Sequence, residues 1–178
     1  MPIVFVQVVD PVGSGFVDSL ARPGGNTTGF TQFEYSLSGK WLELLKEIVP
    51  RITRVAVIRD ATRGPGNAQF AAIQTVASSL GVELTAINAL DVQGLERSIT
   101  AFARSANGGL IVTSGGTGFH RDVIISLAAR LRLPAVYPYR YYREGAWHHR
   151  AAVGARPRRR GDRITILFAA VHESACGT

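Results

Sequence analysis

The feature that most constrains the fold is an alternation of two hydrophobic periods between residues 54 and 137. Short apolar runs typical of β-strands alternate with longer stretches whose apolar residues recur every three or four positions, as on one face of a helix. A helix between two strands carries the chain back across the sheet, so consecutive strands must run parallel. The pattern therefore predicts an α/β fold, an open parallel sheet flanked by helices. The expected strands are residues 54–59, 82–87, 110–112 and 134–137.

Three helices are expected in the same region, and two have recognisable starts. Asn67 is a candidate N-cap for the first helix, with Gly81 as its stop, and Asp91 is a candidate N-cap for the second, which Asn107 and the glycines after it stop. The residues expected to face the sheet are Phe70, Ile73, Val76, Ala77 and Leu80, then Val92, Leu95, Ile99, Phe102 and Ala103, then Val123, Ile124, Leu127, Ala128 and Leu131.

The first 50 residues do not follow this alternation. Residues 3–9 are a near-continuous apolar run, typical of a strand buried on both faces, and we expect it to need partners that this chain does not visibly supply. A loop, a short helical stretch, a sharp turn at residues 22–26 and an extended segment at 27–33 follow. The next helix, which Pro50 ends, is expected to face the core through Leu37, Trp41, Leu44, Leu45 and Ile48.

The net charge of +7 is unevenly distributed. Residues 1–145 carry +3, whereas residues 146–178 carry +4, together with three of the four histidines and the single cysteine. A composition with 46% hydrophobic and 19% charged residues excludes a disordered chain, and a single cysteine excludes an internal disulfide. The basic excess therefore describes the tail rather than the expected folded part.

Neither glycine-rich loop matches a nucleotide-binding motif. The glycines at 13–15 and 116–118 lack the third glycine of a dinucleotide fingerprint, and no Gly-Lys-Ser/Thr occurs. For catalysis, Ser114 and His120 are the only residues that come near to a nucleophile and its base, and no nucleophile elbow surrounds Ser114. We expect no catalytic residue, no metal site and no cofactor. A small hydrolase-like enzyme is an alternative that would need this pair.

Loops that follow parallel strands are where open α/β sheets bind ligands. The candidates are residues 10–15, 60–66, 113–119 and 137–142. Glycine-rich loops offer backbone N–H groups to a carboxylate, although glycine is also needed for turn geometry alone. The last loop is suited to stacking on an organic ligand and pairing with its carboxylate, or else forms an amphipathic strand rim. Its aromatic and basic residues are Tyr137, Tyr139, Arg140, Tyr141, Tyr142 and Arg143.

Several segments together resemble the substrate-binding proteins of bacterial ABC transporters, in the group related to binders of tryptophan and other aromatic amino acids. The most specific is Leu-Ala-Arg-Pro-Gly-Gly-Asn at residues 20–26, followed by Thr-Gly-Phe at 28–30. The resemblance covers about residues 1–145. Supporting segments are residues 2–5, 10–17, 40–46, 108–112 and 133–138.

The resemblance implies a type I periplasmic-binding fold, in which two α/β lobes close on a small, amino-acid-like solute and signal a membrane permease. Residues 1–33 would be a remnant of the first lobe with the crossover strand, residues 34–145 the second lobe, and residues 146–178 an atypical basic tail. Members of the family have no catalytic residues. The resemblance places candidate ligand-binding residues in the cleft loops at Asp10, Ser14, Asp60, Ser114, Thr117, Tyr137 and Tyr139.

Two departures from the family pattern shape the expectations for this chain. Compared with the family pattern, we expect the export signal and most of the first lobe to be absent from this chain. We therefore expect a truncated protein that binds weakly or not at all by itself, and that is cytoplasmic as it stands although the family is periplasmic. After Gly145 a Gly-rich strand is replaced by basic sequence in a chain with 18 arginines and 2 lysines, which indicates a frameshift near Gly145 in a GC-rich gene. Translating the DNA in the other two frames tests this hypothesis.

The sequence also allows two interactions besides solute binding. A dimer through an exposed sheet edge is one expectation. The alternative function is a basic-tailed α/β domain that binds nucleic acid or another polyanion through residues 146–178, although nucleic acid is not the favoured partner. That alternative predicts steeply salt-dependent DNA binding that disappears when the tail is removed.

Overall fold

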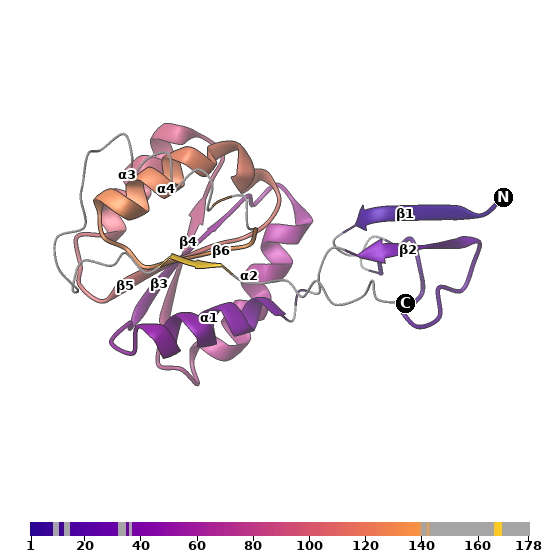
Figure 1. Ribbon diagram of the computed structural model, residues 1–178, viewed down its shortest axis with the longest axis horizontal. Helices are drawn as coiled ribbons and strands as arrows, with labels where there is room; N and C mark the ends of the chain where they lie inside the picture. The colour runs from indigo at the N-terminus through magenta and orange to yellow at the C-terminus, as the bar shows by residue number, and fades with distance from the viewer. Residues whose placement is uncertain are drawn as a thin grey trace, which may run out of the picture.

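The computed structural model describes residues 1–8, 11–12, 15–31, 35, 37–139, 142 and 166–168. A five-stranded parallel sheet with helices on both faces forms the main unit, and a two-stranded parallel sheet lies beside it (Figure 1). The strand order of the large sheet is β4-β3-β5-β6-β7, which confirms the predicted α/β class. The elements of the main unit are α1 (Leu37–Ile48), β3 (Arg54–Arg59), α2 (Gly64–Ala77), β4 (Glu83–Asn88), α3 (Val92–Phe102), β5 (Gly108–Val112), the 3-10 helix η1 (Gly116–His120), α4 (Arg121–Arg130), β6 (Ala135–Tyr137) and β7 (Ile166–Phe168).

The central strands are buried on both faces, and alternate side chains contribute to two separate cores. In β3, Val55 and Val57 pack with α1 and α2, whereas Ala56 and Ile58 pack with α3 and α4. The two pairs of helices cover opposite faces of the sheet (Figure 1). This period of two is what a continuous apolar run produces in a sheet that is covered on both sides. The same alternation assigns Ile111 and Val136 to the first core, and Leu110, Val112, Ala135 and Tyr137 to the second.

The predicted start of α2 is wrong, whereas that of α3 is confirmed. Helix α2 begins at Gly64 with Arg63 as its N-cap, because Pro65 suits the first turn of a helix. The Asn67 side chain instead donates to the carbonyl of Ala61 at 3.0 Å. The Asp91 carboxylate caps α3 as expected, by accepting from the backbone N–H of Gly94 at 2.6 Å.

Helix α1 faces the core through Trp41 and Leu45 as predicted, but the rest of its buried face differs from the prediction. Leu37 and Ile48 are 38% and 42% exposed, whereas Leu42, which was not assigned to the inner face, is fully buried. Contact between α1 and α2 accompanies this difference: Ser38, Gly39 and Leu42 are buried, and a Cβ at Gly39 would lie in ordinary contact with α2, 3.5 Å from the carbonyl oxygen of Ala72.

The first strand finds a partner within the chain, contrary to expectation. Strand β1 (Ile3–Val8) pairs in parallel with β2 (Thr27–Thr31). The prediction that residues 3–9 are buried on both faces is also wrong for the described strand, since Ile3, Val4 and Val6 are 50–66% exposed. The predicted short helix before the turn is not formed either, because residues 15–21 adopt turns and bends.

The turn between β1 and β2 explains why its sequence is so restricted. Gly24 has φ +80°, and a Cβ there would collide with the carboxylate of Asp18. Asn26 aligns the start of the small sheet: its side chain donates to the carbonyl of Met1 at 2.7 Å, and its carbonyl accepts from the N–H of Ile3 at 2.8 Å. These contacts set the parallel register of β1 and β2.

A short strand follows β6 in the large sheet, in the segment to which the sequence assigned no element. Strand β7 pairs in parallel with β6, with Ala135 opposite Ile166 and Tyr137 opposite Phe168. The rest of the basic tail, including its histidines and cysteine, lies outside the described residues. Within the part of the chain that the structure describes, no helix has the length and hydropathy needed to cross a membrane.

Candidate functional site

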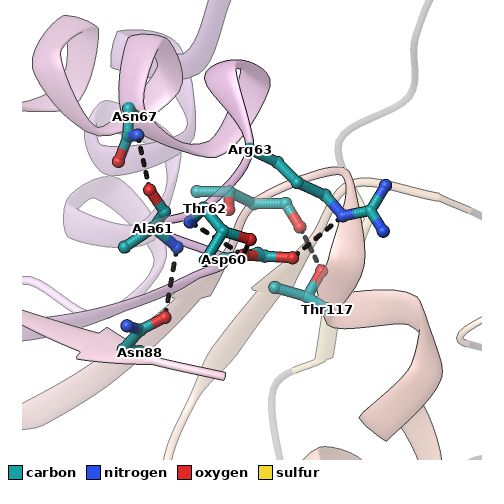
Figure 2. Close-up of polar contacts among 8 residues, drawn as sticks. Asp60, Ala61, Thr62, Arg63, Asn67, Asn88 and Thr117 are labelled. Atoms are coloured by element: carbon teal, nitrogen blue, oxygen red, sulfur yellow. Dashed lines mark hydrogen bonds and ion pairs between the residues drawn. The ribbon is translucent and has the colours of Figure 1, made fainter. Parts of the chain in front are cut away.

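The loops after β3 and β5 meet at the carboxyl edge of the large sheet, where the sequence placed candidate ligand loops. Asp60 follows β3 directly, and Gly116 begins η1 after β5. A Cβ at Gly116 would collide with the Asp60 carboxylate, so glycine is what allows the two loops to approach. The close-up in Figure 2 shows Asp60 between Thr62, Arg63 and the η1 residue Thr117. Three of the predicted site residues, Asp60, Ser114 and Thr117, therefore come from two adjoining loops.

The Asp60 carboxylate is held by its own loop. Its Oδ1 accepts from the backbone N–H of Thr62 at 2.9 Å and from the Thr62 hydroxyl at 2.5 Å, and its Oδ2 accepts from Arg63 Nε at 3.0 Å. The hydrogen bond from the Thr62 side chain is the main cause that lowers the pKa of Asp60 below its ordinary value, against the opposing effect of burial. Asp60 is therefore ionised at neutral pH.

Replacing Asp60 with Asn should lower the free energy of unfolding by about 1–2 kcal/mol at pH 7, because hydrogen bonds to a charged acceptor are lost. The folded pKa lies below the unfolded value, so this contribution is present above about pH 4 and is lost as the pH falls through the folded pKa. Urea titrations of the wild type and Asp60→Asn at several pH values check this. A stability difference that stays constant down to pH 2 would show that the charge is not responsible.

The first residues of the β5 loop direct their hydroxyls into the protein. Ser114 donates twice to Gln69 Oε1, from its backbone N–H at 2.8 Å and from its hydroxyl at 2.9 Å. Thr113 donates to the Ile58 carbonyl at 3.0 Å, and Thr117 donates to the Thr113 carbonyl at 2.5 Å. Ser114 and Thr117 are 1% exposed and Gln69 is fully buried. The Ser114 hydroxyl is therefore committed to Gln69 rather than to His120, and the pair needed by a hydrolase is not formed.

Sequence reasoning missed Gln69 and Arg63. Gln69 lies on the buried face of α2 with Gly66, Ile73 and Ala77, at helical spacing, so a polar residue in that register was the signal for a buried polar contact. Arg63 follows Asp60 by three residues, a spacing that brings the two side chains together in the turn before α2.

The β3–α2 loop is also fixed from both sides at Ala61. Its N–H donates to the Asn88 side chain at 3.1 Å, and its carbonyl accepts from Asn67 at 3.0 Å (Figure 2). The Asn67 oxygen in turn accepts from Arg59, whose guanidinium lies 4.9 Å from the centre of the Phe70 ring. This loop is held in one conformation by neighbouring elements.

The aromatic candidates divide between the core and its edge. Tyr137 is 1% exposed and stacks on Tyr142, with ring centres 5.0 Å apart. Burial raises the pKa of the Tyr137 phenol well above its ordinary value, and Tyr142 adds to the rise. Tyr139 is half-buried and packs against both cores. The remaining candidates, Asp10 and Ser14, lie outside the described residues, as do residues 140, 141 and 143 of the aromatic and basic cluster.

A family comparison covers most of the chain. The family described as "ABC transporter substrate binding protein" matches residues 1–141. The chain belongs to that family. It is a family of solute-binding proteins, which agrees with the resemblance noted in the sequence.

Solved structures of other ABC substrate-binding proteins share the fold of this one. The ABC domain in complex with L-Trp from Streptococcus pneumonia superposes with a TM-score of 0.68 at 16% identity, covering 94% of this chain and 63% of that one. The ligand-free, open structure of CD0873, a substrate-binding protein with adhesive properties from Clostridium difficile, gives a TM-score of 0.60 at 20% identity, covering 94% and 61%. At these identities the likeness shows the fold alone.

A curated relative of this ABC substrate-binding protein matches over a shorter stretch. The tyrosine-binding protein of Clostridioides difficile (strain R20291) is 41% identical over 58 residues, which is 33% of this chain and 16% of the relative. The chain also spans less than two thirds of the length of the solved structures it matches.

Proposed function

We propose that the carboxyl edge of β3, β5 and β6 forms one wall of a cleft in which this protein binds a small amino-acid-like solute. Binding takes place outside the cytoplasm, and the solute is then taken up through an ABC permease. The observation that carries the proposal is the junction of the Asp60 loop with the glycine loop before η1. The junction lies where open α/β sheets bind ligands. The relatives named for L-Trp and tyrosine support an amino acid as the solute class.

The chemistry of this edge suits a solute that carries a carboxylate and an apolar side chain. Asp60 holds the positively charged Arg63 side chain beside backbone that a glycine leaves open. Phe119, in η1 at the same edge, is 82% exposed and offers an apolar surface. Tyr139 is the partly exposed aromatic residue after β6. We propose that Ser114, Thr117 and Tyr137 do not touch the solute. Their buried side chains instead hold the loops and the end of β6 in shape.

We also propose the division of the chain into residues 1–33 from the first lobe, 34–145 as the second lobe and 146–178 as an atypical tail. The separate β1–β2 sheet supports the first boundary. The end of the family match at residue 141 supports the second. In this scheme the exposed apolar residues of β1 and β2 form a surface that is covered either by additional β-strands of the first lobe or by a second copy of the chain. Exposed apolar patches of this kind mark interaction sites.

The proposal is tested by saturation-transfer NMR of the 178-residue chain against the twenty common amino acids. We expect saturable binding of an aromatic amino acid with a Kd on the order of 1 mM, because one wall buries less of a ligand than a closed pocket does. Gly116→Val is the control, since the new side chain displaces Asp60, and it should abolish the signal while the far-UV circular dichroism stays unchanged. Absence of saturable binding to any amino acid, or equal binding by Gly116→Val, would contradict the proposal.

A further inference from the structure

Arg63 is a largely exposed charged group at the carboxyl edge of the sheet. Its side chain is 58% exposed, whereas that of Asp60, which it contacts, is 11% exposed. The Arg63 backbone forms the N-cap of α2 in an extended conformation, so its stem leaves the loop beside Asp60. The side chain is thus tied at one atom and open to solvent beyond it.

The contact with Asp60 uses only one of the guanidinium nitrogens. Arg63 Nε donates to Asp60 Oδ2 at 3.0 Å, and the two terminal nitrogens point away from Asp60 (Figure 2). A guanidinium has five N–H donors in a planar fork, of which Nε supplies one. Within the described residues, the terminal nitrogens have no protein acceptor. Four N–H donors therefore face outward from a fixed position.

Asp60 is in turn unsuited to direct contact with a solute. Three of the roughly four acceptor positions of its carboxylate are occupied by Thr62 and Arg63. Because Thr62 fixes one oxygen, the other can hold Arg63 in a constant orientation. A guanidinium fixed before binding loses less conformational entropy when a ligand arrives.

The loop after β5 leaves room for a ligand on the outer side of Arg63. A Cβ at Gly115 would lie 3.9 Å from Arg63 Cδ, so the stem of Arg63 passes directly over this residue. Gly115 has φ +96°, a conformation that favours glycine. No side chain therefore lies between Gly115 and the stem of Arg63 on the β5 side of the junction.

We propose that Arg63 is the receptor for the carboxylate of the solute, which it binds end-on through its two terminal nitrogens, with Asp60 as the positioning residue. This proposal rests on the proposed function. It assigns direct contact in the β3–α2 loop to Arg63, whereas the sequence analysis named Asp60 as the ligand-binding candidate there. A planar carboxylate matches the spacing of two parallel N–H groups, which a lysine cannot reproduce.

The first test uses a probe that does not depend on the identity of the solute. In protein labelled with ¹⁵N-arginine, sodium acetate should shift the side-chain Nε–H resonance of Arg63 in a saturable way, and the resonance should be absent from Arg63→Lys. Inorganic phosphate at the same ionic strength is the comparison. A larger response to phosphate than to acetate, or no response to acetate, would overturn the proposal whether or not an amino acid binds.

The second test asks whether Arg63 reads the carboxylate of an amino acid. L-Trp should bind wild type about tenfold more tightly than L-tryptophanamide does, which is the order expected for one charge-assisted contact. In Arg63→Gln the two compounds should bind equally, with the affinity of the amide unchanged. Arg97→Gln, which removes a positive charge from the exposed face of α3, should keep the tenfold difference.

Comparing Asp60→Asn with Arg63→Gln distinguishes the role of Arg63, which binds the carboxylate, from that of Asp60, which positions Arg63. Asp60→Asn should reduce the preference for L-Trp over its amide without abolishing it, because Arg63 remains but is less fixed. Arg63→Gln with an undiminished preference for L-Trp, or with both compounds weakened equally, would overturn the assignment. If neither compound binds wild type while acetate shifts Arg63, the proposed solute class is wrong and the carboxylate site stands.

Discussion

Ile58→Ala should lower the free energy of unfolding by about 2–5 kcal/mol, whereas Ile3→Ala should change it by about 0.5 kcal/mol or less. Ile58 lies in β3 and is fully buried against α3 and α4. Truncating its side chain leaves a cavity that the close-packed neighbours fill only in part. Ile3 is 50% exposed on the small β1–β2 sheet. Urea denaturation followed by far-UV circular dichroism measures both changes.

The comparison uses the same substitution in two parallel strands, so helix and strand propensities cancel. Equal losses from the two variants would mean that β1 is buried as deeply as the central sheet, as its apolar sequence alone would predict. Such a result would contradict the division into a cored α/β unit and an uncovered pair of strands.

Gln69→Leu should cost about 3 kcal/mol, because it leaves the N–H and the hydroxyl of Ser114 without their acceptor in the protein interior, at about 1–3 kcal/mol for each unpaired donor. Ser114→Ala is the matched control. It removes the hydroxyl but keeps the backbone hydrogen bond to Gln69, and it should cost about 0.5–1.5 kcal/mol. Thermal and urea unfolding of the two variants give the comparison.

The informative result is which of the two variants, Gln69→Leu or Ser114→Ala, loses more free energy of unfolding. If Ser114→Ala costs more than Gln69→Leu, the hydroxyl has a role that its bond to Gln69 does not explain, and direct contact with a solute becomes the better interpretation of Ser114. The expected order instead identifies the Gln69–Ser114 pair as the contact that holds the β5 loop against α2.

Four of the five strands of the large sheet, β3 to β6, could be predicted from the sequence because their signals are local. Strand β3 is an uninterrupted apolar run, and Asp91 precedes an amphipathic stretch in the pattern of a capped helix. The start of α2 was misplaced because Asn67 has the side chain of a good cap, while the contact that occupies it comes from Ala61 and Arg59, outside the helix. The inner face of α1 was predicted correctly at Trp41 and Leu45 but not at its edges, because burial there depends on packing against α2, which no period within α1 encodes.

The candidate site could be located from the sequence, but the roles of its residues could not. Topology brings the ends of β3 and β5 together, so Asp60, Ser114 and Thr117 were expected near one another. Which polar groups face inward depends on contacts between segments far apart in sequence, such as that of Ser114 with Gln69, 45 residues away. The position of Tyr137 at the end of a predicted strand likewise favoured a ligand contact. In the structure its ring stacks on Tyr142 and lies in the core.

The most direct test of solute binding at this edge is a ¹H–¹⁵N NMR titration of the 178-residue chain with L-Trp. We expect progressive shifts at the backbone amides of residues 60–63 and 113–119, with those of α3, on the far side of the sheet from α1 and α2, unchanged. Saturation in the millimolar range would agree with a solute held by one wall. Shifts that occur elsewhere, or no shifts up to the solubility limit of L-Trp, would contradict it.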